Sequence, residues 1–174
     1  GSLWIVHHNE LLHRHLDGTY THIISQWPVN SFVPLTIAFR NKNEIWIGGA
    51  GGGLMRVIVD EDRVISVKQF SEPDILSSSV VSLLVDRRQW VWVGTDRGIS
   101  VFDGQRWVSQ NTNDGLIWND ISQDGLAGGV DGTIWISTSR GVSHLLKPES
   151  VFQHQTLRPV FSEVRLGNKL LPEQ

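Results

Sequence analysis

The segment IWIG at residues 45–48 recurs with small changes in three other places, as LWIV at 3–6, VWVG at 91–94 and IWIS at 134–137. The central tryptophans, Trp4, Trp46, Trp92 and Trp135, are spaced 42, 46 and 43 residues apart. Side chains alternate between the two faces of an extended strand, so the aliphatic residues share one face and the tryptophan takes the other. Both faces are apolar. Each segment therefore predicts a short strand that must be covered on both sides.

Further short β-rich runs flank the tryptophan segments in a fixed order. The second repeat reads LTIAFR, IWIG, LMRVIV and VISVKQF, and the third reads VVSLLVD, WVWVGT, GISVFDG and RWVSQ. Asp-Gly pairs at 17–18, 103–104 and 131–132 fall between such runs, where tight hairpin turns need positive φ angles. Four antiparallel strands per repeat of this length, with both sheet faces apolar, are typical of a β-propeller blade.

We therefore expect an all-β chain built of four-stranded antiparallel blades. The expected blades are 3–24, which is partial and lacks its inner strand, then 35–70, 80–110 and 121–156. Residues 157–174 are expected to be a linker and the first strands of a following β-sandwich domain. Propellers close with about four to eight blades, so the chain is expected to be the C-terminal part of a larger propeller. Alternatively, a tail strand at 159–166 could close a four-bladed ring.

The glycine-rich run GGAGGG at 48–53 invites a different interpretation, a phosphate-binding loop. A dinucleotide fingerprint requires G-x-G-x-x-G before a helix, and a Walker loop ends in Gly-Lys followed by Ser or Thr. Neither spacing is present, and the following LMRVIV is a strand pattern. The run is better explained as the exit turn of the second tryptophan strand.

Composition limits the classes of function. The chain has 174 residues, a net charge of −3 and 15 Lys and Arg residues spread along its length, so it lacks the basic stripe that nucleic acids require. It contains no Cys, which excludes disulfides, thiolate metal sites and a Cys nucleophile. No apolar run approaches the roughly 18 residues of a membrane span. Gly1-Ser2 looks like a cloning remnant, so any membrane segment is expected outside this chain.

The third repeat resembles the two-component regulator propeller repeat. In the third repeat, the resemblance rests on the segment 80–86, the Trp92 strand, Gly98-Ile99, and Phe102-Asp103-Gly104 with Trp107. The fourth repeat shows the same motif at Asn119, Asp131-Gly132, the Trp135 strand and Gly141-Val142. The tail at 158–171 is similar to the opening strands of the triple-tyrosine domain. The fourth repeat departs in ISQDGLAGG, which begins two residues further from Trp135 than VVSLLVD of the third repeat begins from Trp92.

The resemblance implies a function that the repeat spacing alone does not show. Propellers of this family are extracytoplasmic sensor regions of membrane-anchored bacterial signalling proteins, with a histidine kinase or a diguanylate cyclase on the cytoplasmic side. We therefore expect a periplasmic or extracellular part of an inner-membrane protein. Its expected role is to bind a saccharide, an anionic small molecule or a partner and to relay that event.

The resemblance and the loop positions together suggest where a ligand would bind. Loops that join consecutive blades, and turns after the tryptophan strands, gather on one face of a propeller. Arg97 and Arg140 occupy equivalent turn positions on that face, and paired guanidiniums suit a carboxylate or a sulfate. The candidate site residues are Asp96, Arg97, Arg140, Trp118, Asn119 and Asp120. Ordinary solvated loop residues are the alternative explanation.

Five of the seven histidines lie between residues 7 and 22. His13 and His15 are two apart on an expected strand and so share a face, which suits an imidazole-binding metal if His7, His8 or Glu10 converges as a third ligand. Without such a ligand they form a polar edge strand. No metal or other cofactor is expected from the remaining sequence.

Catalysis has weaker support. No G-x-S-x-G elbow occurs, and Ser143 and His144 would point to opposite faces of a strand. The acids at 61–62, 72 and 74 are explained as solvated turn residues, although a glycan-active propeller enzyme would use paired acids. A second alternative is an interaction scaffold whose blade edges dock another protein or a second copy, since an open fragment exposes apolar faces.

Overall fold

The structure is a computed structural model that describes residues 3–7, 10–28, 31–153, 165–166 and 169–170. The described residues form strands, two short 3-10 helices and connecting turns, and no α-helix occurs among them. The expected all-β class is confirmed, with antiparallel sheets of three or four strands that fit a propeller fragment. Within these ranges, no helix has the length and apolar character needed to cross a membrane.

The first sheet contains three strands in the order β1-β2-β3. Its strands are β1 (Leu3–His7), β2 (Glu10–Arg14) and β3 (Tyr20–Ile24). Trp4 lies on the first of them, in the position that the tryptophan holds on the second strand of a full blade. The sheet is therefore a partial blade without an inner strand, as the sequence predicts.

The next two sheets each contain four strands in sequence order. The second blade consists of β4 (Val33–Asn41), β5 (Glu44–Ala50), β6 (Gly53–Asp60) and β7 (Arg63–Phe70). The third consists of β8 (Val80–Val85), β9 (Val91–Thr95), β10 (Gly98–Phe102) and β11 (Trp107–Gln110). All eight strands coincide with the β-rich runs of the sequence. The loop between them contains a cis peptide bond at Glu72-Pro73.

The fourth sheet has three strands instead of the expected four. They are β12 (Ile121–Gly128), β13 (Ile134–Thr138) and β14 (Gly141–Leu145), preceded by the 3-10 helix η1 (Thr112–Asp114). After β14 the chain forms a second 3-10 helix, η2 (Pro148–Phe152). Proline at its start has no backbone N–H to donate to a strand ladder. The extra residues of this repeat form a bulge, because Ile121 pairs with Thr138 whereas Leu126 pairs with Ile136.

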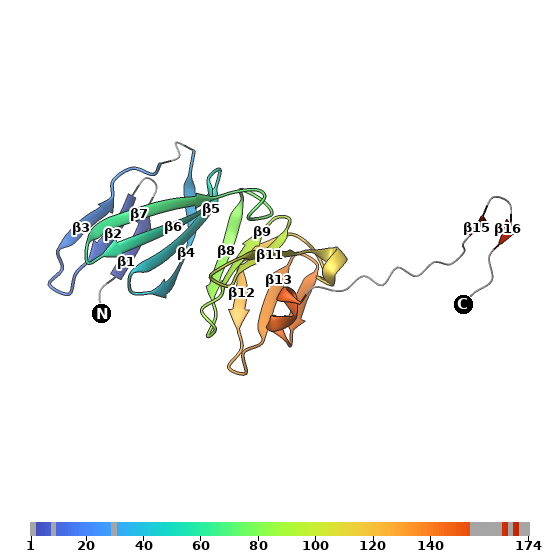
Figure 1. Ribbon diagram of the computed structural model, residues 1–174. Helices are drawn as coiled ribbons and strands as arrows, with labels where there is room; N and C mark the ends of the chain where they lie inside the picture. Colours follow the sequence, from blue (N-terminus) through green and yellow to red (C-terminus); the bar gives the residue numbers. More distant parts are fainter. Residues whose placement is uncertain (1–2, 8–9, 29–30, 154–164, 167–168, 171–174) are drawn as a thin grey trace.

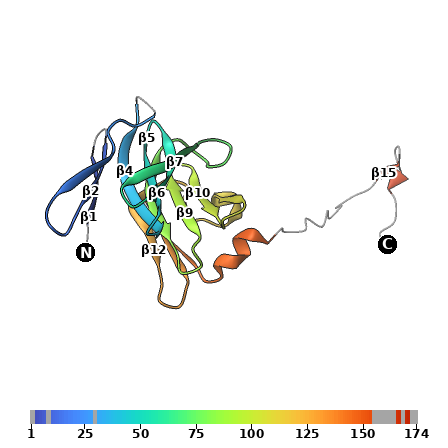
Figure 2. The same cartoon turned by 60° about the vertical axis from the view of Figure 1, so that its left-hand side comes forward.

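The sheets lie side by side in chain order (Figures 1 and 2). The inner strands β4, β8 and β12 contact one another in turn, as strands around a propeller axis do. The remaining strands, β15 (Arg165–Leu166) and β16 (Lys169–Leu170), form a short antiparallel pair. The predicted closing strand at 159–166 and most of the predicted β-sandwich start lie outside the described residues.

The tryptophan strands of the second and third blades pack their indoles on the following blade. Trp46 lies in one apolar cluster with Val80, Val91 and Val93 of the third blade, and Trp92 lies in another with Ile134 and Ile136 of the fourth. Both indoles are fully buried, whereas Trp135 is 43% exposed because no described blade follows it. The tryptophan repeat in the sequence is thus a repeat of contacts between blades.

In the second and third blades, glycine stands two residues after the tryptophan, where the inner strand of the next blade lies against it. A Cβ atom at Gly48 would collide with Val80 Cγ1 of β8, and one at Gly94 would approach Ile121 Cγ2 of β12 within 2.7 Å. In the fourth blade the equivalent residue is Ser137, with no described inner strand beyond it. The absence of a side chain therefore allows consecutive blades to approach closely.

Candidate functional site

The predicted arginines lie on turns that the repeat builds in the same way. Gly98 and Gly141 have φ angles of +126° and +135°, a region that glycine adopts without strain. Before each glycine, a threonine hydroxyl donates to the glycine carbonyl and accepts from the arginine backbone N–H, with Thr95 serving Arg97 and Thr138 serving Arg140. The two arginines are therefore held in equivalent positions on neighbouring blades.

Arg140 stacks on an indole from the loop that enters its own blade. Its guanidinium carbon lies 3.7 Å from the centroid of the Trp118 ring, well inside the distance of a cation–π contact. Trp118 remains 36% exposed. Among the described residues, no carboxylate pairs with Arg140. Stacking uses the face of the guanidinium and leaves the N–H groups at its edge available to an incoming acceptor.

The other two predicted residues of this loop hold it in shape. Asp120 Oδ1 accepts hydrogen bonds from the backbone N–H and the hydroxyl of Ser139, at 3.3 and 2.9 Å. Asn119 Oδ1 accepts from the backbone N–H of Thr112 at 2.8 Å. Asp120 thus fastens the loop that carries Trp118 to the turn that carries Arg140. These contacts pre-form the arrangement in which the indole and the guanidinium meet.

Arg97 has a different partner. Its Nη1 lies 3.0 Å from Glu72 Oε1, and both side chains are more than half exposed. Asp96 lies beside it in the same turn and is also exposed. Glu72 belongs to the loop that enters the third blade, as Trp118 belongs to the loop that enters the fourth. From the sequence, Glu72 is expected to be a solvated acid. Its position in the loop before the third blade matches that of Trp118 before the fourth, and this match is the one sequence feature that indicates a contact with the turn arginine.

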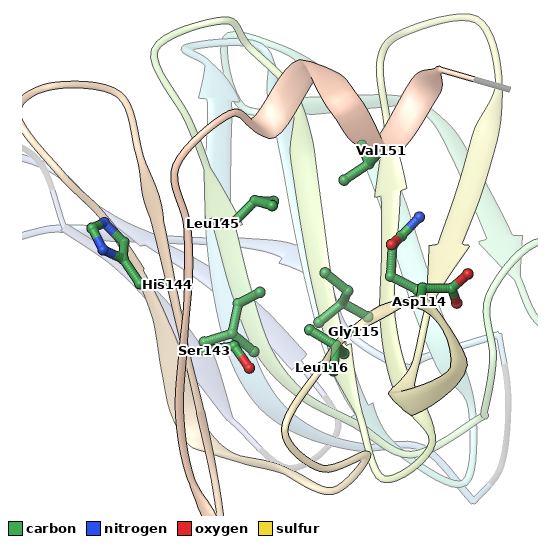
Figure 3. Close-up of a pocket in the computed structure, with 10 residues that line it drawn as sticks. Asp114, Gly115, Leu116, Ser143, His144, Leu145 and Val151 are labelled. Carbon is green, nitrogen blue, oxygen red and sulfur yellow. The ribbon is translucent and has the colours of Figure 1, made fainter. Parts of the chain in front are cut away.

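A small cavity lies beside the loop that carries Trp118, between the third and fourth blades. It has a volume of about 90 Å³ and is lined in part by Ile99, Asp114, Leu116, Ser143 and Val151 (Figure 3). The cavity is too small for a sugar ring, since ligand pockets generally exceed about 300 Å³. Neither Arg140 nor Trp118 is among its lining residues.

Figure 3 also bears on the Ser143-His144 pair. His144 points away from the cavity, on the opposite side of β14 from Ser143 and Leu145. Its ring stacks on Trp135, with centroids 3.6 Å apart and an interplanar angle of 8°. The predicted separation of the serine and the histidine is confirmed, so these neighbours do not form a nucleophile and base pair.

The two candidate metal ligands, His13 and His15, lie together as predicted. The third group beside them is Asp62, from the second blade. Glu10, which the sequence suggests as a third ligand, pairs with His22 at 2.8 Å instead. His7 belongs to β1, and His8 lies outside the described residues. Sequence spacing gives no sign of Asp62, because 49 residues separate it from His13.

Comparisons with known proteins agree with the fold. The sequence matches no protein-family model and no curated protein. It is similar in structure to an extracellular domain assigned to the hybrid two-component system BT3049 of B. thetaiotaomicron, with a TM-score of 0.63 and 21% identity over 83% of this chain and 18% of that chain. The corresponding domain assigned to system BT4673 of the same organism gives a TM-score of 0.64 and 20% identity over 83% of this chain and 20% of that one.

The chain therefore spans about a fifth of the length of the solved structures that it matches. At these identities the likeness shows the fold alone. The fold is that of extracellular domains from two-component systems, and it fits a section of a longer blade array.

Proposed function

We propose that this chain is part of an extracytoplasmic sensor propeller of a bacterial signalling protein. The fold, the similar extracellular domains and the repeat resemblance support this role. In the proposal, the loop face binds a ligand, and the parent protein relays that event across the membrane to a kinase or diguanylate cyclase outside this chain. The described residues are proposed to serve binding rather than catalysis.

The observation that carries the proposal is the Arg140–Trp118 stack on the loop face. A guanidinium fixed on an indole loses little side-chain freedom when it binds an anion, because its orientation is already set. Carboxylates and sulfates accept two parallel N–H bonds from such a group. The exposed part of the Trp118 ring can stack on an apolar sugar face. An acidic saccharide, which presents both features, is the ligand class that this surface fits best.

One observation favours a second candidate function, an interaction scaffold. The outer face of the fourth blade exposes Trp135 and Val142, whose counterparts Trp92 and Ile99 are fully buried, and the His144 ring stacks on Trp135. An apolar face of this kind is covered by another blade, by a second copy or by a partner protein. In the sensor proposal it is covered by a further blade of the same propeller.

Isothermal titration calorimetry with sulfated and uronic acid oligosaccharides tests the sensor proposal. We expect one class of ligand to bind, and Arg140→Ala and Trp118→Ala each to weaken binding at least about tenfold, corresponding to roughly 1.4 kcal/mol. Arg63→Ala is the matched control, because Arg63 is an exposed turn arginine at the opposite end of its blade. Equal affinities in all three variants would refute the assignment of the site.

A further inference from the structure

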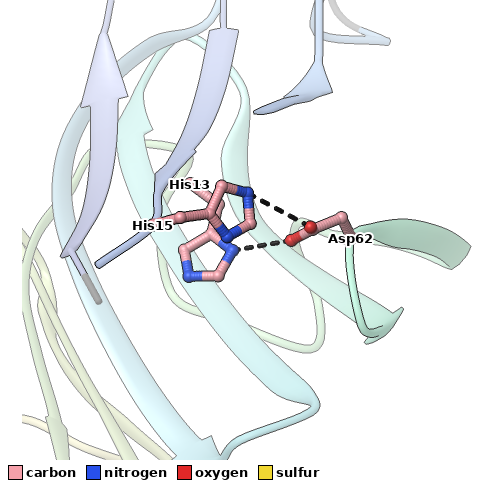
Figure 4. Close-up of side chains that lie close together, drawn as sticks. All are labelled: His13, His15 and Asp62. Carbon is pink, nitrogen blue, oxygen red and sulfur yellow. Dashed lines mark hydrogen bonds and ion pairs between the residues drawn. The ribbon is translucent and has the colours of Figure 1, made fainter. Parts of the chain in front are cut away.

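Three side chains from two blades converge at the outer part of the first and second blades. Ligand atoms of His13, His15 and Asp62 all lie within 4.8 Å of one another. Asp62 Oδ1 lies 2.6 Å from His13 Nδ1, and Asp62 Oδ2 lies 3.3 Å from His15 Nε2. Figure 4 shows both imidazoles directed at the one carboxylate. This cluster lies apart from the Arg140 surface and has no part in the proposed ligand site.

Neighbouring strands hold the two imidazoles in place. His13 pairs across the sheet with Trp4 on one side and Thr21 on the other. Its ring stacks on the Trp4 indole, with centroids 4.3 Å apart. His15 Nε2 also lies 2.8 Å from the Thr21 hydroxyl. The only polar contact of the His13 ring among the described residues is on the nitrogen that faces Asp62, since its Nε2 is buried without a partner.

Asp62 comes from the hairpin turn between β6 and β7. Glu61, at the tip of this turn, has a φ angle of +53°, and the turn places Asp62 against the first blade. The three side chains are only partly exposed, at 14%, 29% and 33%, so an ion could reach them from solvent and would still be partly shielded. Two blades thus supply one set of donors.

We propose that His13, His15 and Asp62 bind a divalent transition-metal ion of the zinc class, which links the first blade to the second. Zinc binds imidazole nitrogen at about 2.0–2.1 Å and carboxylate oxygen at about 2.0–2.2 Å, usually with four ligands. Three protein ligands leave a fourth position for water or for the adjacent Thr21 hydroxyl. Two nitrogens and one carboxylate favour zinc, copper or nickel over calcium and magnesium, which prefer oxygen donors.

The alternative is an ion pair in which two histidines share one carboxylate without a metal. Direct titration distinguishes the two. Protein that carries no histidine tag is treated with a chelator, desalted and titrated calorimetrically with zinc chloride and, separately, with magnesium chloride. We expect one zinc ion per chain, no magnesium binding and a higher melting temperature with zinc.

Variants locate the site. Asp62→Asn keeps the side-chain shape and removes the charge, and His15→Ala removes one imidazole; each is expected to weaken zinc binding by about 100-fold, at the upper end of the losses seen for supporting residues of metal sites. His22→Ala is the matched control, because His22 also pairs with a carboxylate on this sheet, at 2.8 Å from Glu10. It is expected to leave the affinity unchanged.

Asp62→Asn is the most informative variant because Asp62 is remote in sequence from the histidine-rich N-terminal segment. Circular dichroism and melting without metal show whether each variant is folded. The proposal would be overturned if the unaltered protein, freed of chelator, bound no zinc at a 100-fold molar excess of zinc over protein. Equal zinc affinity in the Asp62→Asn and His22→Ala proteins would overturn it too, because the metal would then be held elsewhere.

Discussion

Replacing equivalent tryptophans in two neighbouring blades measures how the blades are held together. Trp92 is fully buried against the fourth blade, and its Nε1 donates to Asp86 Oδ2 at 3.2 Å. Trp135 occupies the same repeat position but is 43% exposed. A fully buried tryptophan covers about 150–250 Å², which at about 25 cal/mol per Å² corresponds to roughly 4–6 kcal/mol. The same arithmetic gives about 2–3 kcal/mol for Trp135.

We therefore expect Trp92→Ala to lower the free energy of unfolding by at least about 2 kcal/mol more than Trp135→Ala does. Chemical denaturation followed by circular dichroism, at a protein concentration low enough for the chain to be monomeric, measures this difference, which corresponds to roughly 4–8 °C in melting temperature for a chain of this size. Equal losses in the two variants would refute the reasoning, because they would show that Trp135 is as well covered in solution as Trp92. A folded Trp92→Ala protein with unchanged stability would refute it more strongly.

Three further predictions follow from other parts of the structure. Gly94→Ala is expected to cost about 1–3 kcal/mol of unfolding free energy, because its Cβ would meet Ile121. Ser137→Ala loses only a 3.4 Å hydrogen bond to Ser122 and should cost less than about 1 kcal/mol; equal costs in denaturation would contradict the close approach of blades. The Thr133 hydroxyl, which donates to Asp131, lowers the pKa of that carboxyl below its usual 3.8, so its stabilisation is present above that pH and is lost as the pH falls through the lowered pKa. The melting-temperature difference between Asp131→Ala and the unaltered protein should therefore shrink in acid, and a difference that grows there would be contrary to this assignment. Sedimentation velocity should show self-association that rises with concentration and weakens in Trp135→Ser; identical profiles would mean that the exposed face of the fourth blade is not the contact.

The strands of the second and third blades could be predicted from sequence because each is a local pattern. Alternation around Trp46 and Trp92, together with turn glycines, determines where such strands begin and end. The fourth blade was harder. Its extra residues form a bulge between Ile121 and Leu126, and a 3-10 helix starting at Pro148 stands where an outer strand was expected. Pro148 and the extra residues are both visible in the sequence, but the alternation that predicts strands does not show that a bulge and a 3-10 helix form there.

The candidate sites show the same division between local and long-range information. Repeat symmetry correctly placed Arg97 and Arg140 on equivalent turns, since the Thr-x-Arg-Gly pattern is local. It did not indicate that Glu72 pairs with Arg97 or that Trp118 stacks on Arg140. Asp62 beside His13 was missed because the contact joins two blades. Sequence periodicity identifies the members of a blade, whereas contacts between blades require the three-dimensional arrangement.

The most direct test of the account is an experimental structure of the longer protein that carries these blades. The account predicts a ring of more than four blades, with a further blade covering Trp135 and with Trp118 and Arg140 exposed on the loop face. A closed four-bladed ring, in which residues 159–166 pair beside β1 as its inner strand and the Trp135 face packs on the first blade, would contradict it.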